Sequence, residues 1–327
     1  MRLRIIKCHG SGNDFPLIDA RRLALDDATW AGVARALADR RGPVGGDGML
    51  LLTEGDGQYA FGFRMFNSDG SESETCLNGL RCVARAGFAA LGIEAARVRL
   101  KTSEADVARD DDLADGVYTV RETAGPVSLD VAAWPMRGLG ERVIETPIAA
   151  TGSARAFTAI AIPNPHLVAF VEAVDEAELV AVGGVCEAAP DWLPNRANVS
   201  FVATPQSETL RGPREASREP DALFVRTYER GVGLTDSCGS AMAASTHAAG
   251  LTGRIAFGTP VTVFNRGGMV RAVAGEDGMV TLSGNATFEW EGAVTVDPAT
   301  GVAGDLVIER WHNDEIDSWA RVADAAR

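Results

Sequence analysis

Two stretches of the chain follow the same plan, and they restrict the folds that the rest can adopt. In each, an arginine within a strand-like run precedes a cysteine by twelve positions: Arg64 precedes Cys76, and Arg226 precedes Cys238. Each cysteine opens an alanine-rich segment with the composition of a helix. The same order at two places indicates an internal repeat.

Other segments extend this repeat. A glycine-punctuated loop around Asn13 is followed by a strand pattern, and a loop around Asn164 is followed by a similar apolar run. Asn198 occupies the place before one strand that Gly48 holds before another. Loop, strand, arginine-containing strand, cysteine and apolar helix therefore occur twice in the same order, which predicts a duplicated α/β unit.

Length and charge exclude some classes of partner. The 327 residues suffice for one large domain or two of ordinary size, and the 46% hydrophobic content is typical of a globular protein. The formal net charge of −14 does not favour nucleic acid or an anionic membrane surface. Because no apolar run reaches membrane-spanning length and the N-terminus enters a strand pattern directly, we expect a cytoplasmic protein.

The cysteines indicate free thiols. An odd, scattered set without a C-x-x-C pair does not fit a disulfide framework, and it offers no complete tetrahedral zinc site. We expect Cys82 and Cys186 to pack in the interior and place Cys8 at a strand end. The remaining two, Cys76 and Cys238, require a chemical explanation.

A thiol at a helix N-terminus meets the positive end of the helix dipole and unpaired backbone N–H groups, and both favour the thiolate. The same N–H groups bind carboxylates, so Leu77, Asn78, Gly239 and Ser240 are candidate donors to one substrate carboxylate. Inversion of a stereocentre by proton transfer needs a base on one face and an acid on the other, and two thiols suit both roles. The alternative is that both cysteines only pack, as buried free cysteines commonly do.

Eight short motifs occur along the chain between residue 9 and about residue 250, and together they carry a resemblance. They are His9-Gly10-x-Gly12-Asn13-Asp14-Phe15, Gly45-x-Asp47-Gly48, Phe66-Asn67-x-Asp69-Gly70-Ser71, Cys76-x-Asn78-Gly79-x-Arg81-Cys82, Asn164-Pro165-His166, Arg196-Ala197-Asn198-Val199, Tyr228-Glu229-Arg230-Gly231 and Cys238-Gly239-Ser240. In these motifs and their order the sequence resembles the diaminopimelate epimerase family of cofactor-independent amino-acid epimerases.

The resemblance implies an α/β (α+β) fold of two pseudo-symmetric domains. Each would be a curled, barrel-like mixed or antiparallel sheet around a central helix, with the active site in the cleft between the domains. We expect the first domain at 1–128, with 284–297 returning to it, and the second at 129–283. The tail at 298–327, with an amphipathic segment from Ile308 to Ala325, has no predicted role. The family also suggests a homodimer.

The resemblance implies a site without cofactor, pyridoxal phosphate or metal. Cys76 and Cys238 would be the catalytic acid and base, and His166 and Glu229 would assist them. The residues that match substrate contacts are Asn13, Gly48, Asn67, Leu77, Asn78, Asn164, Asn198, Glu229, Arg230, Gly239 and Ser240. Four of them, namely Asn67, Asn164, Asn198 and Arg230, match the positions that bind the distal amino-acid group, for which a guanidinium fork and three amides are chemically apt. The implied activity is interconversion of LL- and meso-2,6-diaminopimelate in lysine and peptidoglycan precursor synthesis.

Some positions depart from the family pattern. Leu77 stands where glycine is usual, Leu234 where glutamate is usual, and Ala241 and Met242 where glycine and alanine are usual. Backbone donors survive these changes, but a leucine beside the thiol narrows the pocket, and a Cβ at Ala241 is strained if a positive φ is needed there.

Other hypotheses therefore stay open. The first is the same two-thiol chemistry on a different amino acid. A nucleophilic cysteine hydrolase using Cys76 and His166 is a second, although it leaves Cys238 unexplained. A non-catalytic binding protein is a third, although binding alone needs no acid/base pair. The polar segment 207–220 is expected to be an exposed loop.

Overall fold

The computed structural model describes residues 1–132, 134, 136–204 and 222–326, so the loop expected at 207–220 lies outside the described residues. The chain divides into two compact units. The first unit comprises Met1–Glu122 and Ser283–Val322, and the second comprises Thr123–Leu282 with the last residues from Ala323 onward. The division lies near the sequence-based boundaries at 128 and 284, and residues 298–322 lie in the first unit.

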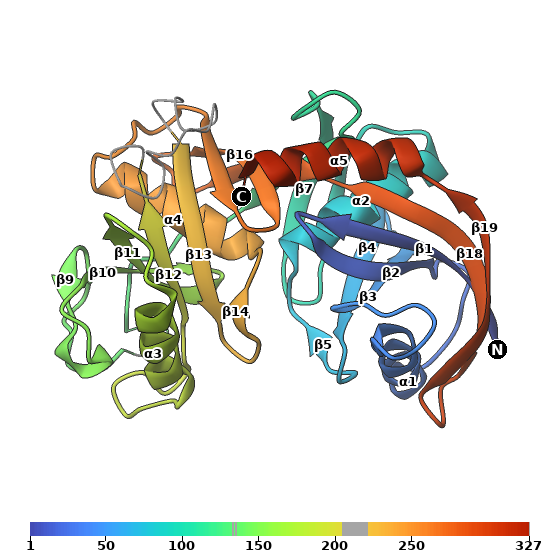
Figure 1. Cartoon of the computed structure of the whole chain (residues 1–327), viewed down its shortest axis with the longest axis horizontal. Helices are drawn as coiled ribbons and strands as arrows, with labels where there is room; N and C mark the ends of the chain where they lie inside the picture. The colour runs from blue at the N-terminus through green and yellow to red at the C-terminus, as the bar shows by residue number, and fades with distance from the viewer. Residues whose placement is uncertain (133, 135, 205–221, 327) are drawn as a thin grey trace. The chain divides into compact units, whose positions relative to one another are not determined.

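The first unit is a mixed sheet with helices packed on it (Figure 1). Its elements are β1 (Arg2–Gly10), β2 (Asn13–Asp19), α1 (Asp27–Ala38), β3 (Gly48–Glu54), β4 (Phe61–Asn67), β5 (Glu72–Ser73), α2 (Leu77–Leu91), β6 (Ala95–Arg99), β7 (Glu104–Asp110), β8 (Thr119–Ala124), β18 (Thr287–Asp297), β19 (Val302–Trp311) and α5 (Asn313–Ala326). The strands pair in the order β19-β18-β1-β2-β3-β4-β6-β7-β8, with β5 beside β4. The pairs β2–β3 and β4–β6 are parallel and the others antiparallel, and these pairings do not close the sheet into a barrel.

The second unit repeats this topology. Its elements are β9 (Thr146–Pro147), η1 (Ala149–Thr151), β10 (Ala156–Ile162), β11 (Asn164–Val171), α3 (Glu176–Glu187), β12 (Asn198–Ala203), β13 (Ala222–Glu229), β14 (Gly233–Thr235), α4 (Gly239–Leu251), β15 (Val261–Asn265), β16 (Gly268–Ala274) and β17 (Val280–Asn285). The pairs β11–β12 and β13–β15 are parallel, and β10–β11, β12–β13, β13–β14 and β15–β16 are antiparallel. Parallel and antiparallel pairs therefore occur in the same order as from β1 to β7, which confirms the predicted mixed fold of two related domains.

The repeat extends to the register of single residues. Arg64 lies opposite Leu51, three residues beyond Gly48, and Arg226 lies opposite Phe201, three residues beyond Asn198. The prediction that Asn198 and Gly48 hold equivalent places is thus confirmed, since each is the first residue of its strand. Because register decides which face of a sheet a side chain occupies, equivalent residues of the two units lie on equivalent faces of their sheets.

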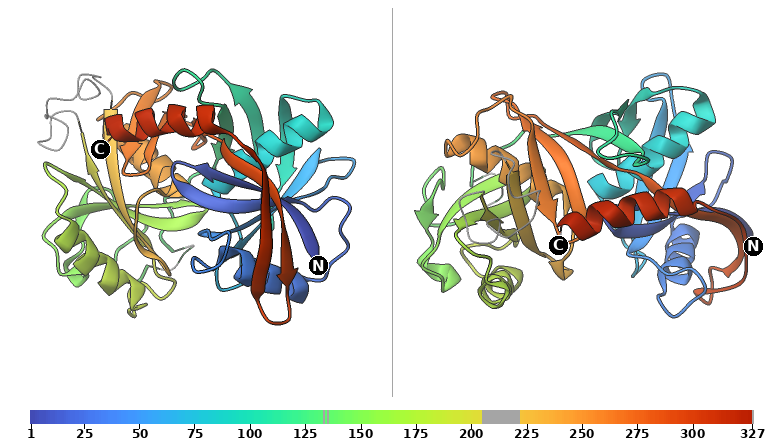
Figure 2. Two further views of the ribbon diagram at one scale, coloured as in Figure 1. Left: turned by 45° about the vertical axis from the view of Figure 1, so that its right-hand side comes forward. Right: turned by 45° about the horizontal axis from the view of Figure 1, so that its top comes forward.

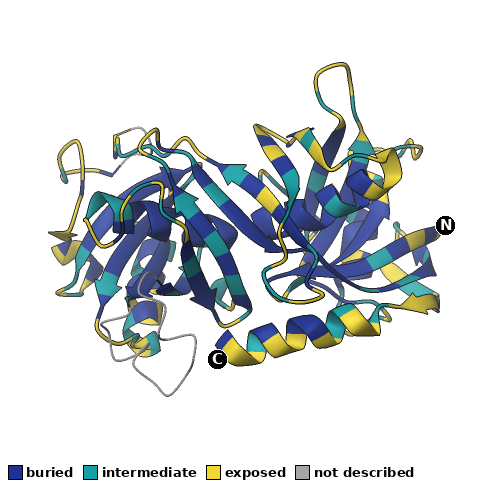
Figure 3. Ribbon diagram, turned by 90° about the horizontal axis from the view of Figure 1, so that it is seen from above, coloured by how far each residue is buried: buried dark blue, intermediate teal, exposed yellow. Residues whose placement is uncertain are grey.

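The helices that follow the two cysteines are buried within their own units. Helix α2 contacts β1, β2, β3, β4, β6 and β7, and α4 contacts the equivalent strands β10, β11, β12, β13, β15 and β16. Alanine and glycine make this possible, because small side chains let strands approach a helix from several sides. Gly92, with φ of 68°, ends α2 as predicted. Figure 3 shows the contrast with α5, which keeps one face exposed.

The repeated arginines tie a central strand to the helix before it. Arg64 donates to Asp27, the first residue of α1, at 2.7 Å, and to Glu72 at 2.7 Å. Arg226 donates to Glu176, the first residue of α3, at 2.7 Å, and to Asp236 at 3.0 Å. Both helices also begin with an aspartate cap, since Asp26 and Asp175 accept N–H groups of the first turn. The helix starts and the arginine-containing strands are therefore fixed to each other.

The C-terminal segment continues the first unit. Strands β18 and β19 form a long antiparallel hairpin whose first strand pairs with β1 (Figure 2). The amphipathic segment expected from Ile308 to Ala325 is divided between the end of β19 and α5, where Trp319 approaches His9 with ring centroids 5.8 Å apart. Among the described helices, none has the length and apolar character to cross a membrane.

We expect Arg226→Ala to lower the free energy of unfolding by about 3 kcal/mol, because the change removes a buried side chain together with its hydrogen bonds to Glu176, Asp236 and the carbonyl of Thr235. The equivalent change Arg64→Ala should cost about 1 kcal/mol, since that side chain is 25% exposed against 4% for Arg226. Urea unfolding of both variants, followed by circular dichroism, measures the difference. Equal losses would show that burial does not distinguish the two arginines.

Candidate active site

Cys76 is the N-cap of α2, as its position at the head of an apolar helix predicts. Its backbone is extended (φ −152°, ψ 99°), and its Sγ accepts the N–H of Gly79 at 3.4 Å. The helix begins at Leu77, so the N–H groups of Leu77 and Asn78 belong to its first turn. A sulfur that accepts a backbone N–H at the positive end of a helix dipole is better able to carry a negative charge.

Asn13, the first residue of β2, lies beside this thiol. Cys76 Sγ donates to Asn13 Oδ1 at 3.9 Å, and Asn13 Nδ2 donates to Asp47 at 2.5 Å. Asp47 also accepts the backbone N–H of Asp14 at 3.1 Å and pairs with Arg40 at 2.6 Å. Asp47 therefore sets the orientation of the Asn13 amide and turns its oxygen to the thiol. The sequence offered the Gly45-x-Asp47-Gly48 motif as a signal, but it did not indicate this contact.

Gly48 and Asn67 face each other at the ends of β3 and β4. A Cβ at Gly48 would lie 2.3 Å from the carbonyl oxygen of Phe66, so this position requires glycine. Asn67 opens the predicted turn, where its Nδ2 donates to Ser71 Oγ at 3.0 Å and its carbonyl accepts the N–H of Gly70 at 2.9 Å. The structure thus gives Asn67 a turn role in addition to the binding role that the sequence predicts.

Cys238 is the N-cap of α4 and is 8% exposed. Its sulfur accepts no capping N–H from the first turn, unlike Cys76, and lies 3.4 Å from Ser240 Oγ. Gly239 and Ser240 are the first two residues of the helix, so their N–H groups lie at its positive end. The two cysteines therefore share a position in the repeat but differ in their immediate hydrogen bonds.

His166 and Asn198 are neighbours on the parallel strands β11 and β12, and both are fully buried. His166 Nε2 lies 3.1 Å from Asn164 Oδ1, so Nε2 carries the proton and Nδ1 has the lone pair. Asn198 Oδ1 accepts the N–H of Arg230 at 3.0 Å. Within the described part of the chain, His166 Nδ1 and Asn198 Nδ2 find no hydrogen-bond partner. Two unsatisfied buried polar atoms are costly, and their adjacency indicates a place where a ligand binds.

Electrostatics keep His166 neutral. Burial, reinforced by the charge of Arg230, lowers the pKa of the His166 imidazole to about 3. A neutral ring with an available Nδ1 lone pair is a hydrogen-bond acceptor, but a pKa of about 3 makes it a weak base near neutral pH. The surroundings of His166 therefore favour a role as a hydrogen-bond acceptor over a role as a proton acceptor.

Glu229 and Arg230 lie at the end of β13, where the strand meets a turn. Arg230 donates from its guanidinium to the carbonyl of Asn195 at 3.1 Å, and the N–H of Gly231 donates to Glu187 at 3.1 Å. These bonds and the Asn198 bond fix the backbone of the Glu229–Arg230 pair beside β12. Half-buried and at a strand end, both side chains are placed as binding residues commonly are.

The predicted site residues fall into two groups. Cys76, Leu77, Asn78, Asn13, Gly48 and Asn67 lie in the first unit, and Cys238, His166, Glu229, Asn164, Asn198, Arg230, Gly239 and Ser240 lie in the second. In the first unit the structure brings Asn13 to Cys76 and pairs Gly48 with Asn67, and in the second it pairs His166 with Asn198 and binds Asn198 to the N–H of Arg230. No group of three or more histidine, cysteine or acidic side chains among the described residues has an arrangement that would hold a metal ion.

The departures from the family pattern have local explanations. Leu77 is buried at the first position of α2, with 7% exposure, and Leu234 packs against the core of the second unit. Ala241 and Met242 are fully buried within α4, and Met242 Sδ accepts from Asn265 Nδ2 at 2.9 Å. Ala241 has a negative φ, so its Cβ causes no backbone strain.

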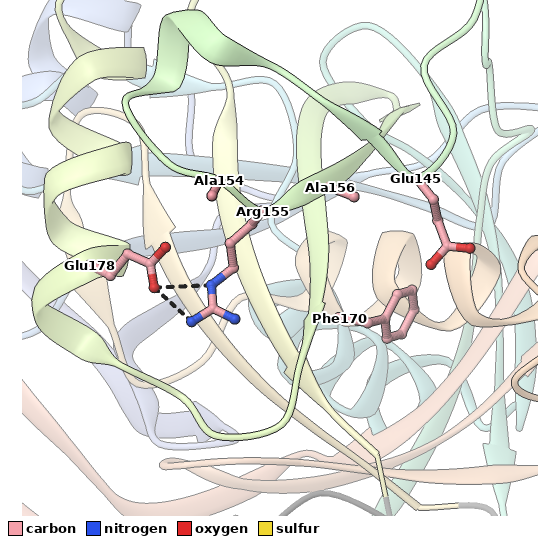
Figure 4. A pocket seen from close by; sticks show the side chains of 6 residues that line it. All are labelled: Glu145, Ala154, Arg155, Ala156, Phe170 and Glu178. Carbon is pink, nitrogen blue, oxygen red and sulfur yellow. Dashed lines mark hydrogen bonds and ion pairs between the residues drawn. The ribbon is translucent and has the colours of Figure 1, made fainter.

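A separate surface pocket in the second unit involves none of the predicted site residues. It is lined by Glu145, Ala154, Arg155, Ala156, Phe170 and Glu178 (Figure 4). Arg155 forms two hydrogen bonds with Glu178, at 2.9 and 2.7 Å, while Glu145 pairs with Arg254 at 2.8 Å. Each charged group that lines the pocket is therefore engaged in an ion pair, Glu145 with Arg254 and Arg155 with Glu178, which is the character of a structural ion-pair cluster.

Comparisons with known proteins agree with the motifs. The family model described as diaminopimelate epimerase matches residues 5–127 and 158–289. Diaminopimelate epimerase of Clostridium acetobutylicum is 37% identical over 303 residues, covering 91% of this chain and 87% of the relative. Diaminopimelate epimerase of Listeria innocua is 33% identical over 309 residues, covering 91% and 90%.

A solved structure shares the fold at low identity. A probable proline racemase from Agrobacterium radiobacter, with bound carbonate, aligns with a TM-score of 0.59 and 14% identity, covering 98% of this chain and 99% of that one. At this identity the likeness concerns the fold, which supports the mixed two-domain architecture described above.

The depressed pKa of His166 predicts a loss of stability in acid. The unfolded chain binds a proton at this histidine below pH 6.5, whereas the folded chain stays neutral down to about pH 3. The stability that the neutral His166 contributes to the folded chain is therefore fully present above pH 6.5, and it is lost as the pH falls toward 3. Between pH 7 and pH 5 the free energy of unfolding should fall by about 2 kcal/mol more in the wild type than in His166→Asn.

Urea titrations at several pH values measure this difference. Nuclear magnetic resonance provides an independent measurement, since the His166 ring should not titrate between pH 5.5 and 8.5. A ring that titrates near pH 6.5 would show that the imidazole is solvated in the folded chain.

Proposed function

Because the chain belongs to the diaminopimelate epimerase family, we propose that it interconverts LL- and meso-2,6-diaminopimelate by two-base proton transfer. The observation that carries the proposal is the repeat: each of two topologically equivalent units presents a cysteine as the N-cap of a buried helix. An isomerase that inverts one stereocentre needs two such groups, whereas a hydrolase would use one.

In the proposed reaction one thiolate takes the α-proton as the C–H bond breaks, and the electron pair moves into the substrate carboxylate. The other thiol then gives a proton to the opposite face of the same carbon, and the roles exchange in the reverse direction. Backbone N–H groups of Leu77, Asn78, Gly239 and Ser240 would bind that carboxylate. Such donors stabilise the charge that develops as the proton leaves.

His166 and Glu229 would assist the thiols in this proposal. His166 would polarise a thiol by accepting a hydrogen bond at Nδ1, because burial keeps the ring neutral and Asn164 engages its other nitrogen. The N–H of Gly79, which donates to Cys76 Sγ, would favour the thiolate at that position. The two units therefore supply different kinds of support to equivalent cysteines.

The distal amino-acid group of the substrate would meet Asn67, Asn164, Asn198 and Arg230. The unsatisfied Asn198 Nδ2 supports a ligand at this place, and a guanidinium binds a carboxylate at two points. Asn13 and Gly48 would complete the substrate contacts on the first unit. We also propose that the reaction serves lysine and peptidoglycan precursor synthesis. The cytoplasmic location and the homodimer are predictions from the sequence.

Deuterium exchange at the α-carbon tests the two-base mechanism. In deuterated water, Cys76→Ala and Cys238→Ala should each lose epimerisation by about 1,000-fold or more. The one remaining thiol should still exchange the α-proton of a single isomer, so the two variants should label opposite isomers. The double variant should label neither.

Cys186→Ala is the matched control, because Cys186 is buried in the second unit and burial raises its pKa to about 12. It should epimerise at the wild-type rate. Full exchange by the double variant would exclude the two thiols as the acid and base.

A panel of amino acids tests the substrate against the alternative of another amino acid. Diaminopimelate should be epimerised, and lysine, which lacks the distal carboxylate, should not. Arg230→Gln should lower kcat/KM for diaminopimelate by about 100-fold, because it removes a charged hydrogen-bonded contact. Arg196→Gln, which removes an ion pair to Glu187 in the same region, is the control and should change little. If the protein turned over a different amino acid preferentially, that amino acid and not diaminopimelate would be its substrate.

A further inference from the structure

Arg81 is a fully buried cation on α2, at the end of the motif that begins with Cys76. Its guanidinium donates to Glu122 at 2.6 Å and to Asn78 Oδ1 at 2.8 Å. It also donates to the carbonyl of Asn285 at 3.1 Å and to Ser11 Oγ at 3.3 Å. One side chain therefore connects α2, the loop after β1, β8 and the end of β17, where Ser283–Asn285 belong to the first unit. The proposed chemistry gives Arg81 no role.

Two glycines make room for this guanidinium. A Cβ at Gly284 would lie 2.7 Å from Arg81 Cζ, and a Cβ at Gly10 would lie 3.0 Å from Nη2 and 2.5 Å from the carbonyl oxygen of Asn78. The backbone of β1 and β17 therefore packs directly on the guanidinium and on the start of α2. Any larger residue at either glycine would displace the arginine.

The ion pair between Arg81 and Glu122 carries a large desolvation cost. Both side chains are fully buried, and Glu122 Oε2 has no hydrogen-bond partner among the residues that the structure describes. Burial raises the pKa of Glu122 to about 7 against the opposing effect of Arg81. Apolar residues of similar size commonly stabilise such a site equally well, so stability alone does not account for the pair.

The partners of Arg81 are the segments that flank Cys76. Asn78 is in the first turn of α2, where its N–H is a proposed carboxylate donor, and Arg81 fixes the oxygen of its side-chain amide. Ser11 begins the loop that ends at Asn13, the residue in contact with the Cys76 thiol. Asn285 holds the same loop, since its Oδ1 accepts the N–H of Ser11 at 2.7 Å.

We infer that Arg81, held by Glu122, is a positioning residue for the proposed epimerisation: it sets the first turn of α2 and the Ser11–Asn13 loop at a fixed distance around the Cys76 thiol. The inference rests on the proposed function, because it assigns Arg81 to the support of that site. Arg81 acts through Asn78 and Asn13 and does not itself touch the reacting atoms. Small displacements of groups around a reacting atom reduce turnover strongly, which gives this support a kinetic consequence.

The test replaces the ion pair by apolar residues. Arg81→Met combined with Glu122→Leu leaves no unpaired charge, so the variant should fold, with an unfolding midpoint lowered by the loss of the donor to Asn78, Ser11 and the Asn285 carbonyl. Its kcat for diaminopimelate, measured where the variant is folded, should fall by about 100-fold while KM changes by less than about threefold. A purely structural pair would leave the kcat of the folded variant unchanged.

The control lies on the same helix. Arg85 is also largely buried and pairs with Glu315 at 2.5 Å, but it contacts none of the predicted site residues in the structure described here. Arg85→Met combined with Glu315→Leu removes a similar ion pair and should retain kcat within about threefold. A loss of kcat equal to that of the Arg81 double variant would overturn the inference, because general damage to α2 would then explain both.

Arg81→Lys provides the second variant in case the double variant does not fold. Lysine can pair with Glu122, but a single ammonium cannot hold Asn78, Ser11 and the Asn285 carbonyl together, so kcat should fall by at least about tenfold. Wild-type kcat in either folded Arg81 variant would overturn the inference. Failure of the proposed function is distinguishable, because the wild type itself would then not exchange the α-proton of diaminopimelate.

Discussion

The start of a buried helix is the constraint on which the rest of each unit depends. A helix can be surrounded by strands only if most of its side chains are small, and its N-terminal N–H groups must then find partners other than water. In α2 the Cys76 sulfur takes one of these groups, and in α4 the corresponding residue is Cys238. In the first unit one residue therefore meets both the requirement for a cap and the provision of a thiol, whereas Cys238 supplies a thiol at the same place without a capping hydrogen bond from its side chain.

The position of each cysteine follows from strand register. Arg64 and Arg226 lie at equivalent places on β4 and β13, and each is tied to the first residue of the preceding helix. A spacing of twelve residues then carries the chain through a short hairpin to the helix start, so a shift in either strand would move the cysteine. This explains why a repeat of low sequence identity keeps the same spacing of twelve residues between arginine and cysteine in both units.

Much of this was predictable from the sequence because it is local. The caps Cys76 and Cys238, the end of α2 at Gly92 and the equivalence of Gly48 with Asn198 all follow from patterns within about a dozen residues. The Arg81 network was not predictable, because it joins α2 to residues 41 and 204 positions away. The amphipathic pattern of the tail was also insufficient, since strand pairing with β18 decides where β19 ends and α5 begins.

The two thiols have different neighbours in the two units. Cys76 has a backbone N–H and an asparagine oxygen beside it, whereas Cys238 has the Ser240 hydroxyl. Gly48 has no room for a side chain, because a Cβ there would clash with the backbone of Phe66. Its counterpart Asn198 carries an amide beside the neutral His166. A reversible two-base reaction requires that each thiol serve as base in one direction and as acid in the other, with comparable basicity. Equal function does not require equal surroundings, and a duplicated fold can keep the helix start while each half adjusts its own proton affinity through different neighbours.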